Sequence, residues 1–216
     1  MRSTVLVALG LVLSVGGGEG TPSSTQEAQA TADRAGPAPP PDLQGFPLAP
    51  APDELATVAL PDNVRAVTAL LERLPPEVAG HMRSPQLDRI SPERARVGYG
   101  EDRRIAGPRN SLLWIQAMDV TTGDFFPTNW TGGQVVAFMA RPGEEGTEAG
   151  RDGDLLWIRK DTFMRTAGSP ARFEMMWGRV DSPWMFSIQA DTRQNRDALL
   201  AAFITAAKSS RRGSGR

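Results

Sequence analysis

The middle and end of the chain consist of short apolar runs separated by turn-forming residues, which limits the folds it can adopt. Each run is rich in Val, Ile, Phe, Trp and Met, and Gly, Pro, Asn or Asp stands between one run and the next. Short segments of this composition are typical of strands. No crossover helix is expected between them, so neighbouring strands should pair antiparallel. The expected strands are residues 96–99, 111–120, 134–140, 154–163, 172–180 and 184–190.

The last two runs predict a hairpin with a defined register. A tight turn at Asp181 and Ser182 places alternate side chains of both strands on one apolar face. The expected pairs are Phe173 with Ala190, Met175 with Ile188, Trp177 with Phe186, and Arg179 with Trp184. The opposite face carries Arg172, Glu174, Met176, Ser187 and Gln189. This mixed face could be partly wet, as antiparallel sheets allow.

Amphipathic helices are expected on both sides of the strand region. Asp62 can cap a helix that Pro75 and Pro76 prevent from continuing, and Asp191 can cap a second helix with Gln194 three residues later. The two apolar stripes are Val64, Val67, Leu70, Leu71 and Leu74, and Leu199, Leu200, Phe203, Ile204 and Ala207. The sequence therefore predicts an α+β fold. It should be an antiparallel sheet of about five or six strands with an N-terminal helix and a C-terminal helix packed on one face.

The N-terminal stretch predicts export. Residues 1–18 have one Arg, an apolar core and a run of three glycines behind it, which is the pattern of a secretory signal peptide, and the core is too short to span a bilayer. Residues 19–54 predict a disordered Pro/Ala-rich linker, residues 55–208 a single domain, and residues 209–216 a flexible basic tail. We expect a secreted, periplasmic or cell-envelope protein of bacterial type. It would touch a membrane only through an uncleaved N-terminal segment.

Composition excludes several functional classes. With 24 basic and 25 acidic residues the net charge is -1, so no global field attracts nucleic acid. The chain has no Cys, and His81 is its single His. A hydrolytic triad and a tetrahedral zinc site are therefore not expected, and the sequence shows no nucleophile elbow. We expect no cofactor.

An acidic, glycine-rich segment between two expected strands is a candidate cation site. Its carboxylates are those of Glu144, Glu145, Glu148, Asp152 and Asp154. They could offer oxygens to Ca²⁺, but their spacing is not that of an EF-hand loop. Glycines and two Arg stand among them, which favours a solvated hairpin loop. We therefore expect no metal ligands.

Residues 124–133 place three large aromatic rings in a connection between strands. Aromatic faces beside amide and carboxylate groups suit partly apolar ligands. The sequence therefore predicts a ligand-binding site at Phe126, Asn129 and Trp130. In the alternative interpretation, Phe125, Phe126 and Trp130 close one end of the sheet as a satellite core.

Few side chains suited to catalysis are present, which favours a non-catalytic binding or accessory domain. We expect it to be exported and to act at the cell envelope or outside it. The sequence does not identify its ligand or protein partner. A second hypothesis is a carboxylate-based hydrolase, for example one acting on glycans, that uses Asp119, Asp124 or Glu174. A third is a sensor or assembly partner that docks on another protein through a sheet edge or the C-terminal helix. An exposed apolar patch would favour this third hypothesis.

Overall fold

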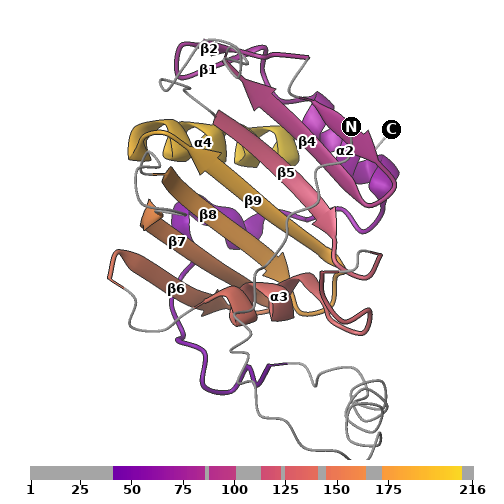
Figure 1. Cartoon of the computed structure of the whole chain (residues 1–216), viewed down its shortest axis with the longest axis vertical. Coiled ribbons are helices and arrows are strands. Elements are labelled where there is room, and N and C mark those ends of the chain that lie inside the picture. Colours follow the sequence, from indigo (N-terminus) through magenta and orange to yellow (C-terminus); the bar gives the residue numbers. More distant parts are fainter. Residues whose placement is uncertain are drawn as a thin grey trace, which may run out of the picture. The chain divides into compact units, whose positions relative to one another are not determined.

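An antiparallel sheet forms the centre of the computed structural model (Figure 1). Its strands are β3 (Arg89–Ser91), β4 (Arg94–Tyr99), β5 (Leu113–Asp119), β6 (Thr147–Asp152), β7 (Leu155–Phe163), β8 (Arg172–Arg179) and β9 (Trp184–Ala190). The seven strands lie in the order β3-β4-β5-β9-β8-β7-β6. A separate hairpin joins β1 (Glu77–Val78) to β2 (His81–Met82). The expected α+β antiparallel class is confirmed, and the sheet is wider than expected.

The structure describes residues 41–85, 88–100, 113–122, 125–140, 145–163 and 172–210. All of them fall within one compact unit, Pro37–Arg216. The expected signal segment, the linker up to residue 40, Asp124, Glu144 and the tail beyond residue 210 lie outside the described residues. Within the described part of the chain, no helix has both the length and the apolar character needed to cross a membrane.

The hairpin of β8 and β9 has the register that the sequence predicts. Phe173 pairs with Ala190, Met175 with Ile188, and Trp177 with Phe186. The rings of Trp177 and Phe186 stack with their centroids 5.6 Å apart, and Phe203 from the C-terminal helix contacts both. The apolar face of this hairpin is therefore the centre of the main core.

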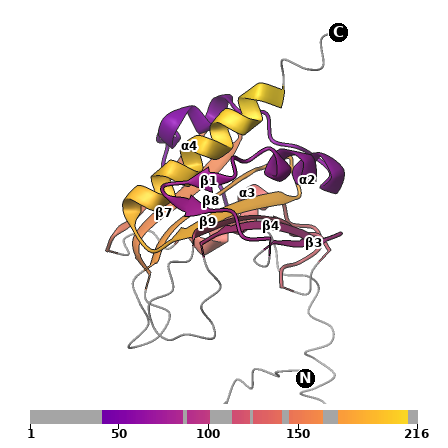
Figure 2. The same ribbon diagram turned by 90° about the horizontal axis from the view of Figure 1, so that it is seen from above.

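Two helices and a 3-10 turn cover one face of the sheet. These are η1 (Pro52–Thr57), α2 (Val64–Glu72) and α4 (Arg193–Ser210). Figure 2 shows α2 and α4 on the same side of the strands, and their apolar stripes pack against the inner face of the sheet. The buried residues include Val67, Leu70, Leu71, Val97, Ile115, Trp177, Leu199 and Phe203. The N-terminal and C-terminal helices that the sequence predicts are both present.

The N-caps of these two helices differ by one residue from those expected. The Asn63 side chain accepts from the backbone N–H of Ala66 at 2.9 Å, whereas Asp62 accepts from the Asn63 amide. At α4 the hydroxyl of Thr192 accepts from the N–H of Asn195 at 3.1 Å. In both cases the residue nearer the helix reaches the free N–H groups of the first turn, so Asp62 and Asp191 are not the caps.

Residues 134–140, expected as a strand, belong instead to helix α3 (Gly132–Met139). Thr131 and Gln134 form a capping box, in which each side chain accepts from the other residue's backbone N–H. The start of α3 touches the backbone of the sheet, because a Cβ on Gly132 would lie 2.1 Å from the carbonyl oxygen of Trp184. The strand prediction was wrong because the capping box outweighs the β propensity of Val135, Val136 and Phe138.

The segment expected as a solvated hairpin loop contributes strand β6, which lies at one edge of the sheet. Residues upstream of position 55, where the sequence places the start of the domain, run along this edge. The N–H of Arg151 donates to the carbonyl of Pro47 at 2.7 Å, and the N–H of Ala49 donates to the carbonyl of Arg151 at 3.1 Å. Backbone therefore covers the β6 edge. No described strand pairs with the outer edge of β3.

Candidate functional site

The aromatic residues expected to bind a ligand pack around Trp130. This ring is 5% exposed and lies in a second core on the α3 side of the sheet. Phe126 stacks on it with centroids 6.3 Å apart, and Phe138 of α3 meets it edge-on at 5.3 Å. Asn129 and Phe125 are exposed. The structure thus brings Phe126 and Trp130 together and adds Phe138, which the strand prediction for this segment did not foresee.

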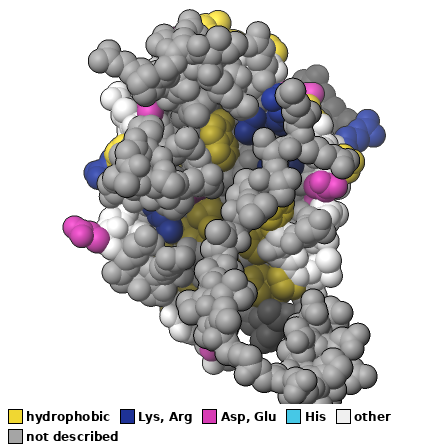
Figure 3. Space-filling view, viewed as in Figure 1, with side chains coloured by type: hydrophobic (Ala, Val, Ile, Leu, Met, Phe, Trp, Pro, Cys, Tyr) yellow, Lys and Arg dark blue, Asp and Glu magenta, His cyan; other side chains and the backbone are white. Residues whose placement is uncertain are grey.

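Apolar side chains are visible on this face of the molecule in Figure 3. The exposed fraction is 76% for Phe125, 58% for Phe138 and 37% for Met139. Of these three, Phe138 contacts Trp130, and Trp130 itself is buried and does not line an open aromatic slot. The arrangement supplies an apolar surface, and Asn129, the polar residue expected to orient a ligand, is exposed.

The two carboxylates of the hydrolase hypothesis that the structure describes, those of Asp119 and Glu174, are not brought together. Asp119 accepts from the backbone N–H and the hydroxyl of Thr121. Glu174 is buried and accepts from the Gln189 amide at 2.8 Å. Asp119 pairs with Trp184 and Glu174 with Gln189, and these two β9 positions lie about 17 Å apart along the strand. A glycosidase pair needs a separation of roughly 5–9.5 Å.

The carboxylates of the acidic segment and the side chain of the single His make contacts with other residues of the protein. Glu148 pairs with Arg159, Asp154 with Arg179, and Asp152 accepts from the N–H of Ala51. Within the described ranges, no three metal-binding side chains gather at one point. The Nε2 atom of His81 lies 3.2 Å from the Asn195 amide nitrogen, which also donates to Asp191.

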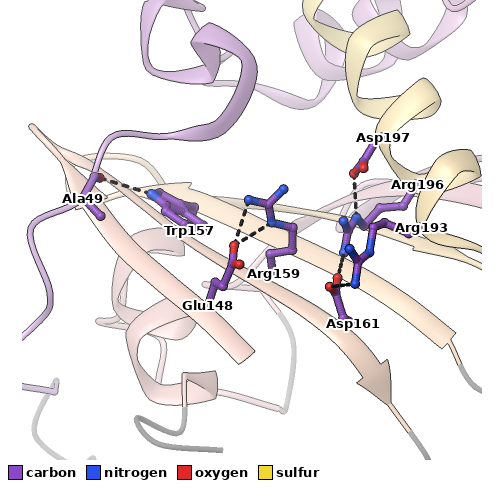
Figure 4. Close-up of polar contacts among 8 residues, drawn as sticks. All are labelled: Ala49, Glu148, Trp157, Arg159, Asp161, Arg193, Arg196 and Asp197. Atoms are coloured by element: carbon purple, nitrogen blue, oxygen red, sulfur yellow. Dashed lines mark hydrogen bonds and ion pairs between the residues drawn. The ribbon is translucent and has the colours of Figure 1, made fainter. Parts of the chain in front are cut away.

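A cluster of charged side chains joins the start of α4 to β7 (Figure 4). Arg196 is fully buried and donates from Nη1 to Asp161 at 2.6 Å and from Nε to Asp197 at 2.9 Å. Arg193 also contacts Asp161, whereas the Nη2 atom of Arg196 has no hydrogen-bond partner. The two guanidinium groups match the two carboxylates, so the cluster fixes the helix to the strand and leaves no net charge for a ligand.

A groove between α2 and β3 is the best candidate for a binding site. Its volume is about 570 Å³, within the usual range for ligand sites. Figure 2 shows α2 above the β3–β4 edge of the sheet. The lining residues are Val64, Arg65, Thr68, Ala69 and Glu72 from α2, and Ile90, Ser91 and Pro92 from β3 and its turn. The floor and one wall are largely apolar, and charged side chains stand only on the helix wall.

The positions of these side chains follow from helix period and strand register. The inward stripe of α2 is buried in the core, and Arg65, Thr68, Ala69 and Glu72 lie on a neighbouring side of the helix. Ile90 pairs with the buried Ala95, so it faces the same side of the sheet as α2, and its side chain is 61% exposed. The groove thus has a large apolar side chain at its centre that no part of the described chain covers.

The helix and the strand on either side of the groove run in opposite directions. Arg83 donates to the backbone oxygen of Glu72 at 3.3 Å and forms an ion pair with Asp88, the residue before β3. The C-terminal end of α2 therefore lies beside the start of β3. Arg65, near the N-terminal end of α2, lies at the end of the groove formed by Ser91 and Pro92.

The outer edge of β3 offers one hydrogen-bond donor and one acceptor. On β4, the N–H of Gly98 bonds to Asp88 and its carbonyl accepts from the N–H of Ser84, whereas the carbonyl of Glu93 accepts from the β5 side. Even-numbered β4 residues thus face β3. By the antiparallel alternation, the N–H and C=O of Ile90 then point away from β4. The following Pro92 has no N–H to extend this edge.

The charges of α2 are placed against its macrodipole. Arg65 lies in the first turn and Glu72 at the last position, and the first turn has no acidic residue and the last turn no basic one; Asp62 and Arg73 flank the helix outside these turns. Both side chains are exposed, and neither forms an ion pair with another described residue. This reversed order, with Thr68 and Ala69 between the charges, is a sequence signal that could have pointed to this face of the helix.

Comparison with family models, curated proteins and solved structures finds no match to this chain.

Proposed function

We propose that this protein is an exported, non-catalytic binding domain that takes up an extended segment of a partner protein in the groove between α2 and β3. The observation that carries the proposal is a groove of about 570 Å³ beside a sheet edge with which no described strand pairs. Addition of a strand to a sheet edge is a common mode of peptide recognition. Backbone hydrogen bonds supply part of the affinity, and pockets for alternate side chains supply specificity.

The groove has parts that match this mode. Ile90 offers one N–H and one C=O to a partner backbone and presents its side chain to the groove. A partner side chain lying over Ile90 and Ala69 would be enclosed between the strand and the helix. Burial of one Leu-sized side chain contributes about 1.5–3 kcal/mol, and each backbone hydrogen bond about 0.5–1.5 kcal/mol. After ordering costs, we expect weak, reversible binding with a Kd on the order of 10 µM to 1 mM.

Export is the second part of the proposal and rests on the N-terminal sequence. Residues 1–18 have the pattern of a signal peptide, and a Pro/Ala-rich stretch follows. A binding domain on such a stretch would reach partners at the cell envelope. Fractionation of bacterial cells producing the full chain tests this: retention of the whole product in the cytoplasm would contradict export and leave the binding proposal in place.

Selection from a random-peptide phage library tests the groove. The full chain is immobilised, and enriched peptides are then measured against Ala69→Arg, which puts a long charged side chain on the groove wall. Ala201→Arg is the matched control, since Ala201 is an exposed α4 residue outside the groove. We expect enriched peptides to bind the parent and Ala201→Arg equally and Ala69→Arg at least tenfold more weakly. Equal binding to all three proteins would reject the groove as the site.

A further inference from the structure

The two charges of α2 stand on either side of the apolar centre of the groove. Arg65 and Glu72 are about two helical turns apart, which separates them by about 10 Å along the helix axis. Ala69 lies between them on the helix wall, and Ile90 lies opposite on the strand. The groove therefore has Arg65 at the end near Ser91 and Pro92, an apolar middle, and Glu72 at the end near the start of β3, where Arg83 is already paired with Asp88.

This arrangement opposes the stability of α2. A basic side chain in the first turn and an acidic side chain at the last position both interact unfavourably with the helix macrodipole. Neither side chain gains a compensating ion pair with another described residue. Local rules of helix design are commonly broken where a residue serves a function. We therefore expect a partner that interacts with both charged side chains.

An extended segment fits the spacing of these charges. Side chains two residues apart share one face of a strand, so positions i-2, i and i+2 span about 13–14 Å. A segment antiparallel to β3 runs in the same direction as α2. It would place its i-2 side chain near Arg65, its central side chain over Ile90 and Ala69, and its i+2 side chain near Glu72. Every pairing in the large sheet is antiparallel, and antiparallel pairing is slightly more stable per residue.

On these grounds we propose that the groove selects five-residue segments that bind antiparallel to β3. Their first residue is acidic, their third is a large aliphatic residue and their fifth is basic, and the second and fourth can be any residue. This inference rests on the proposed function and adds the chemistry and direction of the ligand. The aliphatic side chain supplies affinity, and the two charges supply direction. A segment with the reverse charge order would pair its charges by binding parallel to β3, with weaker backbone hydrogen bonding. We therefore expect the acid-first order to be preferred and the reverse order to bind more weakly.

The test uses three blocked nonapeptides and the full chain. The acid-first peptide is Ser-Thr-Asp-Thr-Leu-Thr-Lys-Thr-Ser, the base-first peptide exchanges Asp and Lys, and the neutral peptide has Gln at both places. Binding is measured by fluorescence anisotropy of labelled peptides at low ionic strength. We expect the acid-first peptide to bind about 3- to 10-fold more tightly than the base-first one, since exposed ion pairs are individually weak. This ratio should approach one in 1 M salt.

The variant Arg65→Glu/Glu72→Arg provides the reciprocal measurement. It keeps the apolar centre, and it places both charges in the order that the helix macrodipole favours, so the helix is retained. In this variant the base-first peptide should bind more tightly than the acid-first one. The inversion assigns the preference to these two residues, because a general effect of peptide charge would not follow the exchange.

The remaining outcomes separate this inference from the proposed function. Equal affinity for all three peptides, with loss of binding in Ala69→Arg, would overturn the charge order and leave the groove as a peptide site. Tighter binding of the base-first peptide to the parent would overturn the direction. Undetectable binding of every peptide at millimolar concentration would overturn both proposals. A dimer of the parent that Ala69→Arg dissociates would assign the groove to a second copy of this chain, which also overturns the peptide proposal.

Discussion

Replacement of Arg65 by Gln should stabilise the fold. The side chain is exposed at the second position of α2 and has no ion pair within the described residues, so its charge acts mainly on the positive end of the helix. A charge in this position changes stability by about 0.3–1 kcal/mol at low ionic strength. Gln has nearly the same helix propensity as Arg, so the free energy of unfolding should rise by about that amount. In a domain of this size the melting temperature should rise by about 1–4 °C.

Urea unfolding followed by tryptophan fluorescence measures the change, because Trp177 and Trp184 are buried in the core. The gain should appear at 10 mM salt and disappear at 1 M, where the Debye length is about 3 Å. Arg73→Gln is the control at the other end of α2. Arg73 is the C-cap and donates to the carbonyl of Ala69, so its replacement should lower stability. Loss of stability in Arg65→Gln, or a gain that salt does not alter, would refute the charge–dipole argument.

Three further results are expected. Arg196→Ala should lower the free energy of unfolding by about 3–5 kcal/mol, because it removes a buried guanidinium that contacts Asp161 and Asp197. Arg196→Met should lower it less, since the Met side chain retains part of the buried packing; chemical unfolding of both variants compares them. Gly132→Ala should lower the free energy of unfolding by more than about 3 kcal/mol or prevent folding, because its Cβ would lie 2.1 Å from the backbone oxygen of Trp184. Soluble yield and a melting curve measure this loss. Burial raises the pKa of Tyr99, the single Tyr, to about 12, so absorbance at 295 nm should show no ionisation near pH 10. The free energy of unfolding should fall between pH 10 and 12, because only the unfolded state loses the proton there.

Local patterns in the sequence predict the parts of the fold that local interactions determine. The register of β8 and β9 follows from alternation around a tight turn, and the structure has the pairs Phe173–Ala190, Met175–Ile188 and Trp177–Phe186. The apolar stripe of α2 follows from the helix period, and Val67, Leu70 and Leu71 are buried as expected. These features depend on residues that are close in the sequence, so no knowledge of the remaining chain is needed.

Two elements were missed, α3 despite a local capping signal and β6 because it depends on distant contacts. The segment 134–140 contains β-branched and aromatic residues, yet it is helical because Thr131 and Gln134 cap it and because glycines let it rest on β8 and β9. Strand β6 lies in a segment rich in Gly and charged residues, and it is held by β7 on one side and by residues 47–49 on the other. Composition alone indicates a loop at β6, because most of the stability of this strand comes from its pairing partners and not from its own residues.

The groove was missed for the same reason. Its helix wall and its strand wall come from segments that are separate in the sequence, and each alone is an ordinary exposed surface. The sequence predicts a binding site at Phe126, Asn129 and Trp130, because large aromatic rings lie there in a connection between strands. The structure instead places Trp130 in a core, because Phe126, Phe138 and the buried residues of the α3 side pack around it.

The two edges of the sheet differ in a way that bears on the proposed binding mode. At β6 the chain's own backbone occupies the edge through the hydrogen bonds of Ala49 and Arg151 with each other and with Pro47. At β3 protection is of another kind: the strand has three residues, one of them Arg89, and Pro92 follows it. Short, charged, proline-bounded edges resist indefinite strand addition. The N–H and C=O of Ile90, which point away from β4, can hold a short segment in register but add little affinity. Discrimination between partners must then come from the side chains of α2, and their two charges lie where the helix alone would not favour them.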